Sequence, residues 1–245
     1  MPSVDCTRPD AHEHEFSFAF QPIVDAPARR VVSYEALVRG PRGESSAEVF
    51  ARIPPRQLHR FDQALRVKAI RLAVRLNLCT SLNLNFLPNS VGRSSEYLKA
   101  TLDASGEAGF PVERLVFEVT EKEWRQHRGS VEGCFGRCSA LGFRTAIDDF
   151  GAGHSGLRRL TEYQPDFIKL DRDLIADIHL QRVKQVIVRG ICSMCGELLI
   201  TPVAEGVEKA EEYRWLRQAG IRIFQGYYFA RPSFEALSVV PPGLF

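Results

Sequence analysis

Polar side chains recur at the ends of short apolar runs along this chain, and their types suit metal-assisted chemistry on a phosphate ester. Taken singly, each could be a residue that simply reaches solvent at the edge of a strand. Taken together, the five carboxylates among them would repel one another and raise their own pKa values unless cations balanced them. The residues are Glu35, Asn83, Glu118, the neighbours Asp148 and Asp149, Lys169, Glu205 and Gln225.

The charge balance of this set favours a site for two divalent metal ions. Two such ions would supply four positive charges against five carboxylates, and Lys169 would supply the fifth. All the proposed ligands are oxygen donors, which favours Mg²⁺ or Mn²⁺ over zinc. Because Asp148 and Asp149 are adjacent, one can bridge both ions while the other binds the second. Two ions about 3.5–4 Å apart stabilise the attacking and leaving oxygens of a phosphodiester.

A phosphodiester also needs a cation for its non-bridging oxygens. Arg39 lies four residues beyond Glu35 and could supply a bidentate contact. The alternative is that Arg39 is an ordinary exposed surface residue.

The elements that must position these residues alternate between short strand-like and longer helix-like segments, a pattern typical of parallel βα units. The predicted strands are 16–24, 31–38, 81–87, 115–119, 144–147, 166–170, 199–204 and 221–224. Predicted helices include 60–76, 130–140, 180–194 and 209–219. This order predicts an α/β fold, a TIM-type (β/α)8 barrel, in which the carboxyl ends of the strands converge at one mouth.

The start of this barrel should be modified. Only residues 25–30 separate the first two strands, which is too short for a crossover helix, so these strands should pair antiparallel. The 245 residues suit one barrel, which typically needs roughly 250. We therefore expect a polar, flexible N-terminal segment over residues 1–14 and a single domain over residues 15–245.

Net charge and the distribution of apolar residues argue against nucleic acids and membranes as binding partners. A formal charge of +2 lacks the basic excess expected of a protein that coats DNA or RNA. No apolar run is long enough to span a bilayer, and the N-terminus lacks a signal-peptide pattern, so we expect a cytoplasmic protein without a membrane partner. The spacing of Cys192 and Cys195 could suit redox or zinc chemistry, but their apolar helical context favours buried helix positions. Cys134 and Cys138 are likewise expected in the core.

Over essentially its whole length the chain resembles the EAL-domain phosphodiesterases, which linearise cyclic di-GMP. The resemblance depends on motifs that follow one another in the family's order. They are FQPIV at 20–24, EALVR at 35–39, NLN at 83–85, FEVTE at 117–121, DDFGAG at 148–153, IKLD at 168–171, AEGVE at 204–208 and QGYYFARP at 225–232.

The resemblance implies a role for each matching residue in hydrolysis of cyclic di-GMP to linear pGpG with Mg²⁺ or Mn²⁺. Lys169 would orient or deprotonate the attacking water, Gln225 would position water or substrate, and Glu121 would anchor a glycine-containing mobile loop at 149–157. The implied metal ligands are Glu35, Asn83, Glu118, Asp148, Asp149 and Glu205. Gln21, Leu37, Arg39 and Tyr227 would line the dinucleotide groove. A homodimer is implied as well, and an external regulatory protein could act on it.

One departure and two alternatives accompany this interpretation. His154 stands where the family usually has Tyr, which could alter how the loop orders. The first alternative is a receptor or adaptor that has lost its chemistry, but such members lose residues equivalent to Glu35, the Asp pair or Lys169, and all are present here. The second is an unrelated barrel metalloenzyme of the enolase type, which accounts for the carboxylates but not for Arg39, Gln225 and the glycine loop together.

Overall fold

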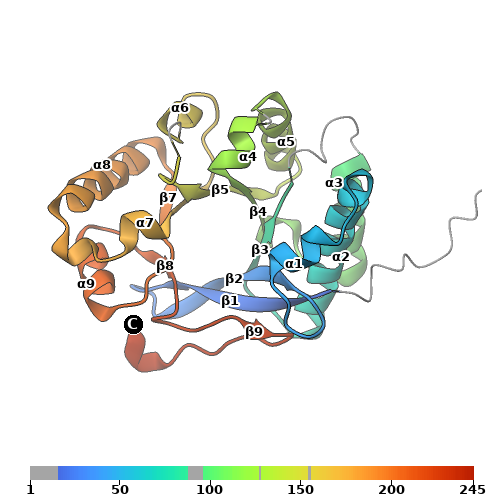
Figure 1. The fold of residues 1–245 in the computed structure, drawn as a ribbon, viewed down its shortest axis with the longest axis horizontal. Coiled ribbons are helices and arrows are strands. Elements are labelled where there is room, and N and C mark those ends of the chain that lie inside the picture. Colours follow the sequence, from blue (N-terminus) through green and yellow to red (C-terminus); the bar gives the residue numbers. More distant parts are fainter. Residues whose placement is uncertain (1–15, 88–95, 127, 154–155) are drawn as a thin grey trace, which may run out of the picture.

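Eight strands close into a barrel, with helices arranged around its outside (Figure 1). The structure, a computed structural model, describes residues 16–87, 96–126, 128–153 and 156–245. The strand order is β2-β3-β4-β5-β6-β7-β8-β1, and pairing of β1 with β2 closes the ring. The strands are β1 (Ser17–Asp25), β2 (Arg30–Arg39), β3 (Ser81–Asn85), β4 (Leu115–Thr120), β5 (Arg144–Phe150), β6 (Phe167–Leu170), β7 (Thr201–Ala204) and β8 (Ile223–Gln225). The predicted TIM-type barrel is confirmed.

The predicted modification at the start of the barrel is confirmed too. Strand β1 lies between β8 and β2 and is antiparallel to both, whereas the other neighbouring pairs are parallel. In the tight turn between β1 and β2, the amide of Ala28 donates to Asp25 Oδ1 over 3.0 Å. A further short strand, β9 (Ser233–Phe234), pairs antiparallel with β1 at Ala19. It was not predicted, because two residues are too few to show an alternation.

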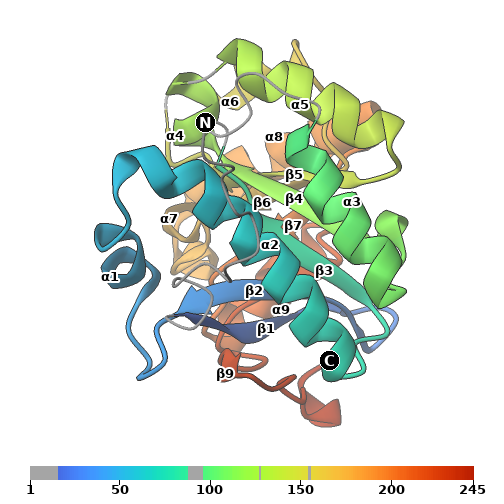
Figure 2. The ribbon, with the colours of Figure 1, turned by 90° about the vertical axis from the view of Figure 1, so that its right-hand side faces the viewer.

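Helices cover the outside of the barrel from several sides (Figure 2). They are α1 (Ser46–Ala51), α2 (Leu58–Arg75), α3 (Glu96–Ala108), α4 (Glu121–Gln126), α5 (Arg128–Ala140), α6 (Gly156–Leu160), α7 (Arg172–Ile175), α8 (Arg182–Leu198) and α9 (Ala210–Gln218). Helix α8 continues four residues beyond its predicted end and stops at Leu199, whose φ of 58° is left-handed. The strand predicted from Leu199 therefore begins only at Thr201.

The cysteines of the described chain occupy helices and one exposed site rather than a disulfide framework. Cys195 is buried and Cys192 half-buried on α8, and Cys134 and Cys138 are buried on α5. All described cysteines, including exposed Cys79, are free thiols. The predicted core positions are thus confirmed for Cys134, Cys138 and Cys195, whereas Cys192 is only half-buried. Among the described residues, none of the helices combines the length and the apolar character that crossing a bilayer requires.

The strands build the barrel interior in layers. Side chains two residues apart on a strand face the same side, so Ser33 lies below Glu35 on β2, and Ser81 lies below Asn83 on β3. Here "below" means toward the amino ends of the parallel strands. The strands are also staggered, since Asn83 pairs with Val116 of β4 rather than with a residue near its carboxyl end. The stagger places Asn83 at the border between an upper and a lower layer.

Candidate active site

The amine of Lys169 on β6 lies among carboxylates from four other segments of the barrel. Its Nζ is 2.9 Å from Glu118 Oε2 on β4 and 2.9 Å from Glu205 Oε1, just beyond β7. It is also 3.1 Å from Asp148 Oδ1 on β5 and 3.2 Å from Glu35 Oε2 on β2. Lys169 is only 1% exposed, so these contacts are screened from solvent. The structure therefore brings together the acidic residues that were predicted on separate strands.

Glu35 accepts hydrogen bonds from two amide side chains besides its contact with Lys169. Gln225 Nε2 donates to Glu35 Oε2 over 2.7 Å and also lies 3.3 Å from Gln21 Oε1. Asn85 Nδ2 donates to Glu35 Oε1 over 3.0 Å. No role was predicted for Asn85, although its position two residues after Asn83 places it on the same face of the strand. That spacing was the signal that could have identified it.

Glu118 is the most deeply buried carboxylate of the site, with no exposed surface. Asn83 Nδ2 donates to Glu118 Oε1 over 2.6 Å, and the hydroxyl of Ser33 donates in turn to Asn83 Oδ1. Burial raises the pKa of Glu118 to about 8, although the charge of Lys169 acts in the opposite direction. A single ammonium group is thus too little positive charge to keep this carboxylate readily ionised.

A second acidic group is formed by Asp148, Asp149 and Glu205, whose nearest oxygens lie within 4.8 Å of one another. Asp149 has a left-handed φ of 53°, a conformation that is costly for a residue other than glycine. Burial, followed by the charge of Asp148, raises the pKa of Asp149 to about 6. Burial also raises the pKa of Glu205, and the neighbouring carboxylates add to that effect.

The site fits hard divalent cations better than it fits Lys169 alone. Burial opposes the charge on Lys169, yet its acidic neighbours hold the pKa of this amine above its usual range, so it is an ammonium ion. Three carboxylates still have raised pKa values despite that ammonium. Buried carboxylate and amide oxygens are the ligands that Mg²⁺ and Mn²⁺ prefer.

Glu121, at the start of α4, contacts the backbone of the loop that follows β5. The amides of Gly151 and Gly153 donate to Glu121 Oε2 over 3.1 and 3.3 Å. A Cβ atom at Gly153 would lie 2.6 Å from Glu121 Oε1, so this close approach requires glycine. The contacts agree with the predicted anchoring role. His154 lies outside the described residues.

Two openings at this mouth are lined by the residues predicted to contact a dinucleotide. One, of about 340 Å³, is bordered by Glu35, Leu37 and Arg39, and the other, of about 290 Å³, is bordered by Gln21 and Tyr227 among others. Arg39 is half-buried rather than fully exposed, and its guanidinium donates to the carbonyl of Val38.

Tyr227 has a neighbour for which the sequence offered no signal. The guanidinium carbon of Arg231 lies 4.1 Å from the centre of its ring, and Tyr227 itself is 47% exposed. A cation over an aromatic face holds the ring in place while leaving its other face open.

Comparison with known families gives a match over most of the chain. Residues 7–232 match the model of a family described as the EAL domain. Among curated relatives, the blue light- and temperature-regulated antirepressor BluF of Escherichia coli is 31% identical over 94% of this chain and 56% of its own length. The probable cyclic di-GMP phosphodiesterase PdeN of E. coli is 30% identical over 89% of this chain and 43% of its own. The chain thus spans about half the length of these relatives.

Solved structures show the same architecture. A standalone versatile EAL protein from Vibrio cholerae, in a form bound to c-di-GMP, is 41% identical with a TM-score of 0.88, covering 97% of this chain and 99% of that one. BlrP1 of Klebsiella pneumoniae, in a manganese and cyclic di-GMP complex, is 38% identical with a TM-score of 0.88, covering 98% of this chain and 60% of that one.

Proposed function

This chain belongs to the EAL domain family, and we propose that it hydrolyses one phosphodiester bond of cyclic di-GMP to give linear pGpG. The observation that carries the proposal is the set of four carboxylates gathered around Lys169 at one mouth of the barrel. The names of similar proteins support the choice of substrate, since they include a probable phosphodiesterase and two structures bound to this dinucleotide.

We propose that two Mg²⁺ or Mn²⁺ ions complete the site. When bound, such ions stabilise the negative charge on the attacking and leaving oxygens of the phosphodiester. The residues that would hold them are Glu35, Asn83, Glu118, Asp148, Asp149 and Glu205. Manganese in the similar BlrP1 complex supports this class of ion.

The protein's own groups would bind the substrate and direct the water. Lys169 donates to its acidic neighbours as an ammonium ion, so it can orient a water molecule. A role as general base would require cations to take over the charge of those carboxylates, because that would lower the pKa of Lys169. Gln225, fixed by Glu35 and Gln21, would position water or substrate. Arg39 and Tyr227 would hold the phosphate and a guanine ring.

The direct test is incubation of purified protein with cyclic di-GMP and either Mg²⁺ or Mn²⁺, followed by chromatographic detection of pGpG. We expect turnover that chelation abolishes. Glu35→Ala should remove nearly all activity, because it deletes the acceptor shared by Lys169, Gln225 and Asn85. Binding of cyclic di-GMP without turnover, in the presence of either ion, would instead support the receptor or adaptor alternative.

We propose a homodimer formed through the exposed apolar face at α8. Leu180, just before the helix, and Val183 on it are 75% and 73% exposed, and Ile187 lies four residues further on the same face. Val183→Asp should convert a dimer into a monomer in sedimentation experiments, and a dimer that survives this change would exclude this face. We also propose that the protein acts in the cytoplasm and that a separate regulatory protein can act on it.

A further inference from the structure

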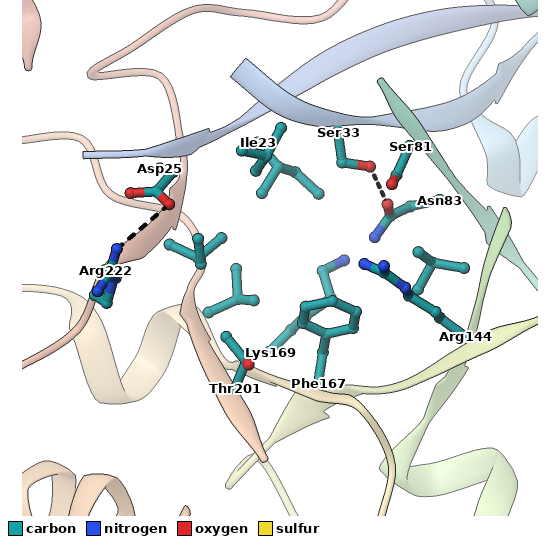
Figure 3. Close-up of a pocket in the computed structure, with 14 residues that line it drawn as sticks. Ile23, Asp25, Ser33, Ser81, Asn83, Arg144, Phe167, Lys169, Thr201 and Arg222 are labelled. Carbon is teal, nitrogen blue, oxygen red and sulfur yellow. Dashed lines mark hydrogen bonds and ion pairs between the residues drawn. The ribbon is translucent and has the colours of Figure 1, made fainter. Parts of the chain in front are cut away.

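A further cavity, which we call the amino-end cavity, lies at the opposite end of the barrel, near the amino ends of the strands (Figure 3). Its volume is about 380 Å³, and it is lined by the first residues of several strands, including Ser81, Arg144, Phe167, Thr201 and Ile223. Asn83 and Lys169 also line it, so their side chains separate this space from the acidic mouth. None of the proposed catalytic steps uses it.

Small residues create this cavity. The interior of a barrel of this type is ordinarily filled by layers of bulky side chains. Here Ser33, Ser81 and Thr201 occupy lower-layer positions on β2, β3 and β7, where branched apolar residues would close the space. The remaining wall is apolar, with Val116, Phe167, Val203 and Ile223 among its residues. A mostly apolar concavity of this size with a few polar groups is typical of a small-molecule site.

The polar groups of the cavity include one cation that no described protein group neutralises. The side chain of Arg144 points into the cavity (Figure 3), and it forms no hydrogen bond or ion pair with any other described residue. The second arginine, Arg222, lies at the rim 3.8 Å from Asp25, which balances its charge. Within the described part of the chain, the hydroxyls of Ser81 and Thr201 also form no side-chain hydrogen bonds.

We propose that the amino-end cavity binds a small organic anion. The carboxylate of this ligand would lie on Arg144, and its apolar body would lie against Phe167, Val116 and Val203. A guanidinium group binds a carboxylate through two parallel hydrogen bonds, which gives both strength and orientation. The apolar walls explain why an organic anion should bind better than inorganic phosphate. The ligand would not compete with a dinucleotide at the acidic mouth, because Lys169 and Asn83 lie between the two spaces.

Benzoate is the probe for this proposal, and benzyl alcohol is its neutral counterpart. Calorimetric titration of the full chain should show benzoate binding, with benzyl alcohol and inorganic phosphate each about tenfold weaker or more. Arg144→Gln should weaken benzoate by about tenfold, and Arg144→Lys, which keeps the charge but not the fork, should lie between. The matched control is Arg114→Gln, an exposed arginine before β4 that does not line the cavity, and it should bind benzoate like the natural protein.

Two further measurements locate the ligand. Ser81→Leu should abolish benzoate binding by filling the cavity while pGpG formation and the melting temperature show that the barrel is intact. Saturating cyclic di-GMP, added with chelator so that it is not hydrolysed, should leave the benzoate affinity unchanged. The proposal is overturned if benzoate fails to bind at millimolar concentration, if Arg144→Gln binds it equally well, or if cyclic di-GMP displaces it.

Discussion

The two ends of the barrel share one backbone architecture but differ in how their charged side chains are paired. At the carboxyl end, Gln225 donates to Glu35 and Asn83 donates to Glu118, and both carboxylates pack against the buried amine of Lys169. At the amino end, Arg144 has no partner among the described residues, and small side chains leave an open space. The alternation of side chains along each strand therefore supplies inward-facing positions at both ends of the barrel. The residue type at each position decides whether a functional group or an open space results.

The same contrast separates two kinds of charge. Lys169 is 1% exposed, so the charge of its ammonium group needs the neighbouring carboxylates, and their charges need the ammonium group. Arg144 is exposed to solvent, so its charge needs no partner for the fold. Removing one member of a buried, paired set leaves uncompensated charge, whereas removing a solvated charge costs little.

The largest effect should follow Lys169→Met. This change leaves four carboxylates, three of them buried, facing one another without a cation. We therefore expect loss of activity and a free energy of unfolding lower by about 3 kcal/mol or more in chelator. Divalent ions should recover part of that stability. Arg144→Met, at the other end of the barrel, should lower the free energy of unfolding by no more than about 0.5 kcal/mol, with or without ions. Equal destabilisation by both variants in denaturant titrations would contradict the proposed difference between the two ends.

Removal of divalent ions from the natural protein should abolish turnover and lower its melting temperature. Ions at about a hundred times their dissociation constant stabilise a native state by about 2.7 kcal/mol. Asp25→Asn is the control, since it removes a carboxylate at the far end of the barrel and should leave the ion-dependent shift unchanged. A melting temperature that is insensitive to Mg²⁺ and Mn²⁺ would argue against the proposed ion site.

Glu121→Ala should reduce kcat by about tenfold or more, because the amides of Gly151 and Gly153 lose their common acceptor and the loop beside Asp149 loses its position. Glu121→Gln retains an amide oxygen that can accept both bonds, so it should keep most of the activity. Steady-state kinetics distinguishes the two variants. If Glu121→Ala and Glu121→Gln are equally impaired, the charge rather than the hydrogen bonding is what matters.

A smaller effect is expected at the groove. Tyr227→Ala removes the ring proposed to hold a guanine and should raise KM for cyclic di-GMP about threefold, because an exposed aromatic contact contributes little more than about 0.5 kcal/mol. The change in kcat should be small, since this ring lies away from the reacting phosphate. Tyr227→Phe keeps the ring and should match the natural protein. A selective fall in kcat would show that Tyr227 acts on the reacting groups instead.

The smallest effect should come from Thr201→Val in the amino-end cavity. The hydroxyl of Thr201 forms no side-chain hydrogen bond within the described chain, so the isosteric change should alter stability by no more than about 0.5 kcal/mol. Activity should be unchanged. Gln225→Leu, which removes the donor shared by Glu35 and Gln21, is the contrasting change in the upper layer and should impair turnover strongly. Similar outcomes for the two variants would erase the distinction between the layers.

Local patterns in the sequence predicted much of the fold and of the candidate site. The alternation of segments predicted the barrel, and the short connection at 25–30 predicted the antiparallel β1–β2 pair, because both are local properties of the chain. Residue type at the strand ends predicted the acidic set around Lys169. Boundaries were less accurate where conformation depended on packing, as at Leu199, whose left-handed backbone ends α8 instead of starting β7.

Which of these groups touch one another is a property of the tertiary structure. The contact of Asn85 with Glu35 and the open space beside Arg144 depend on how far each strand slides past its neighbour and on closure through β1. Stagger and closure are set by side-chain packing around the whole ring. Because no single segment contains that information, the sequence specified the inventory of chemical groups, while their distances, shared hydrogen bonds and cavities followed from the assembled barrel.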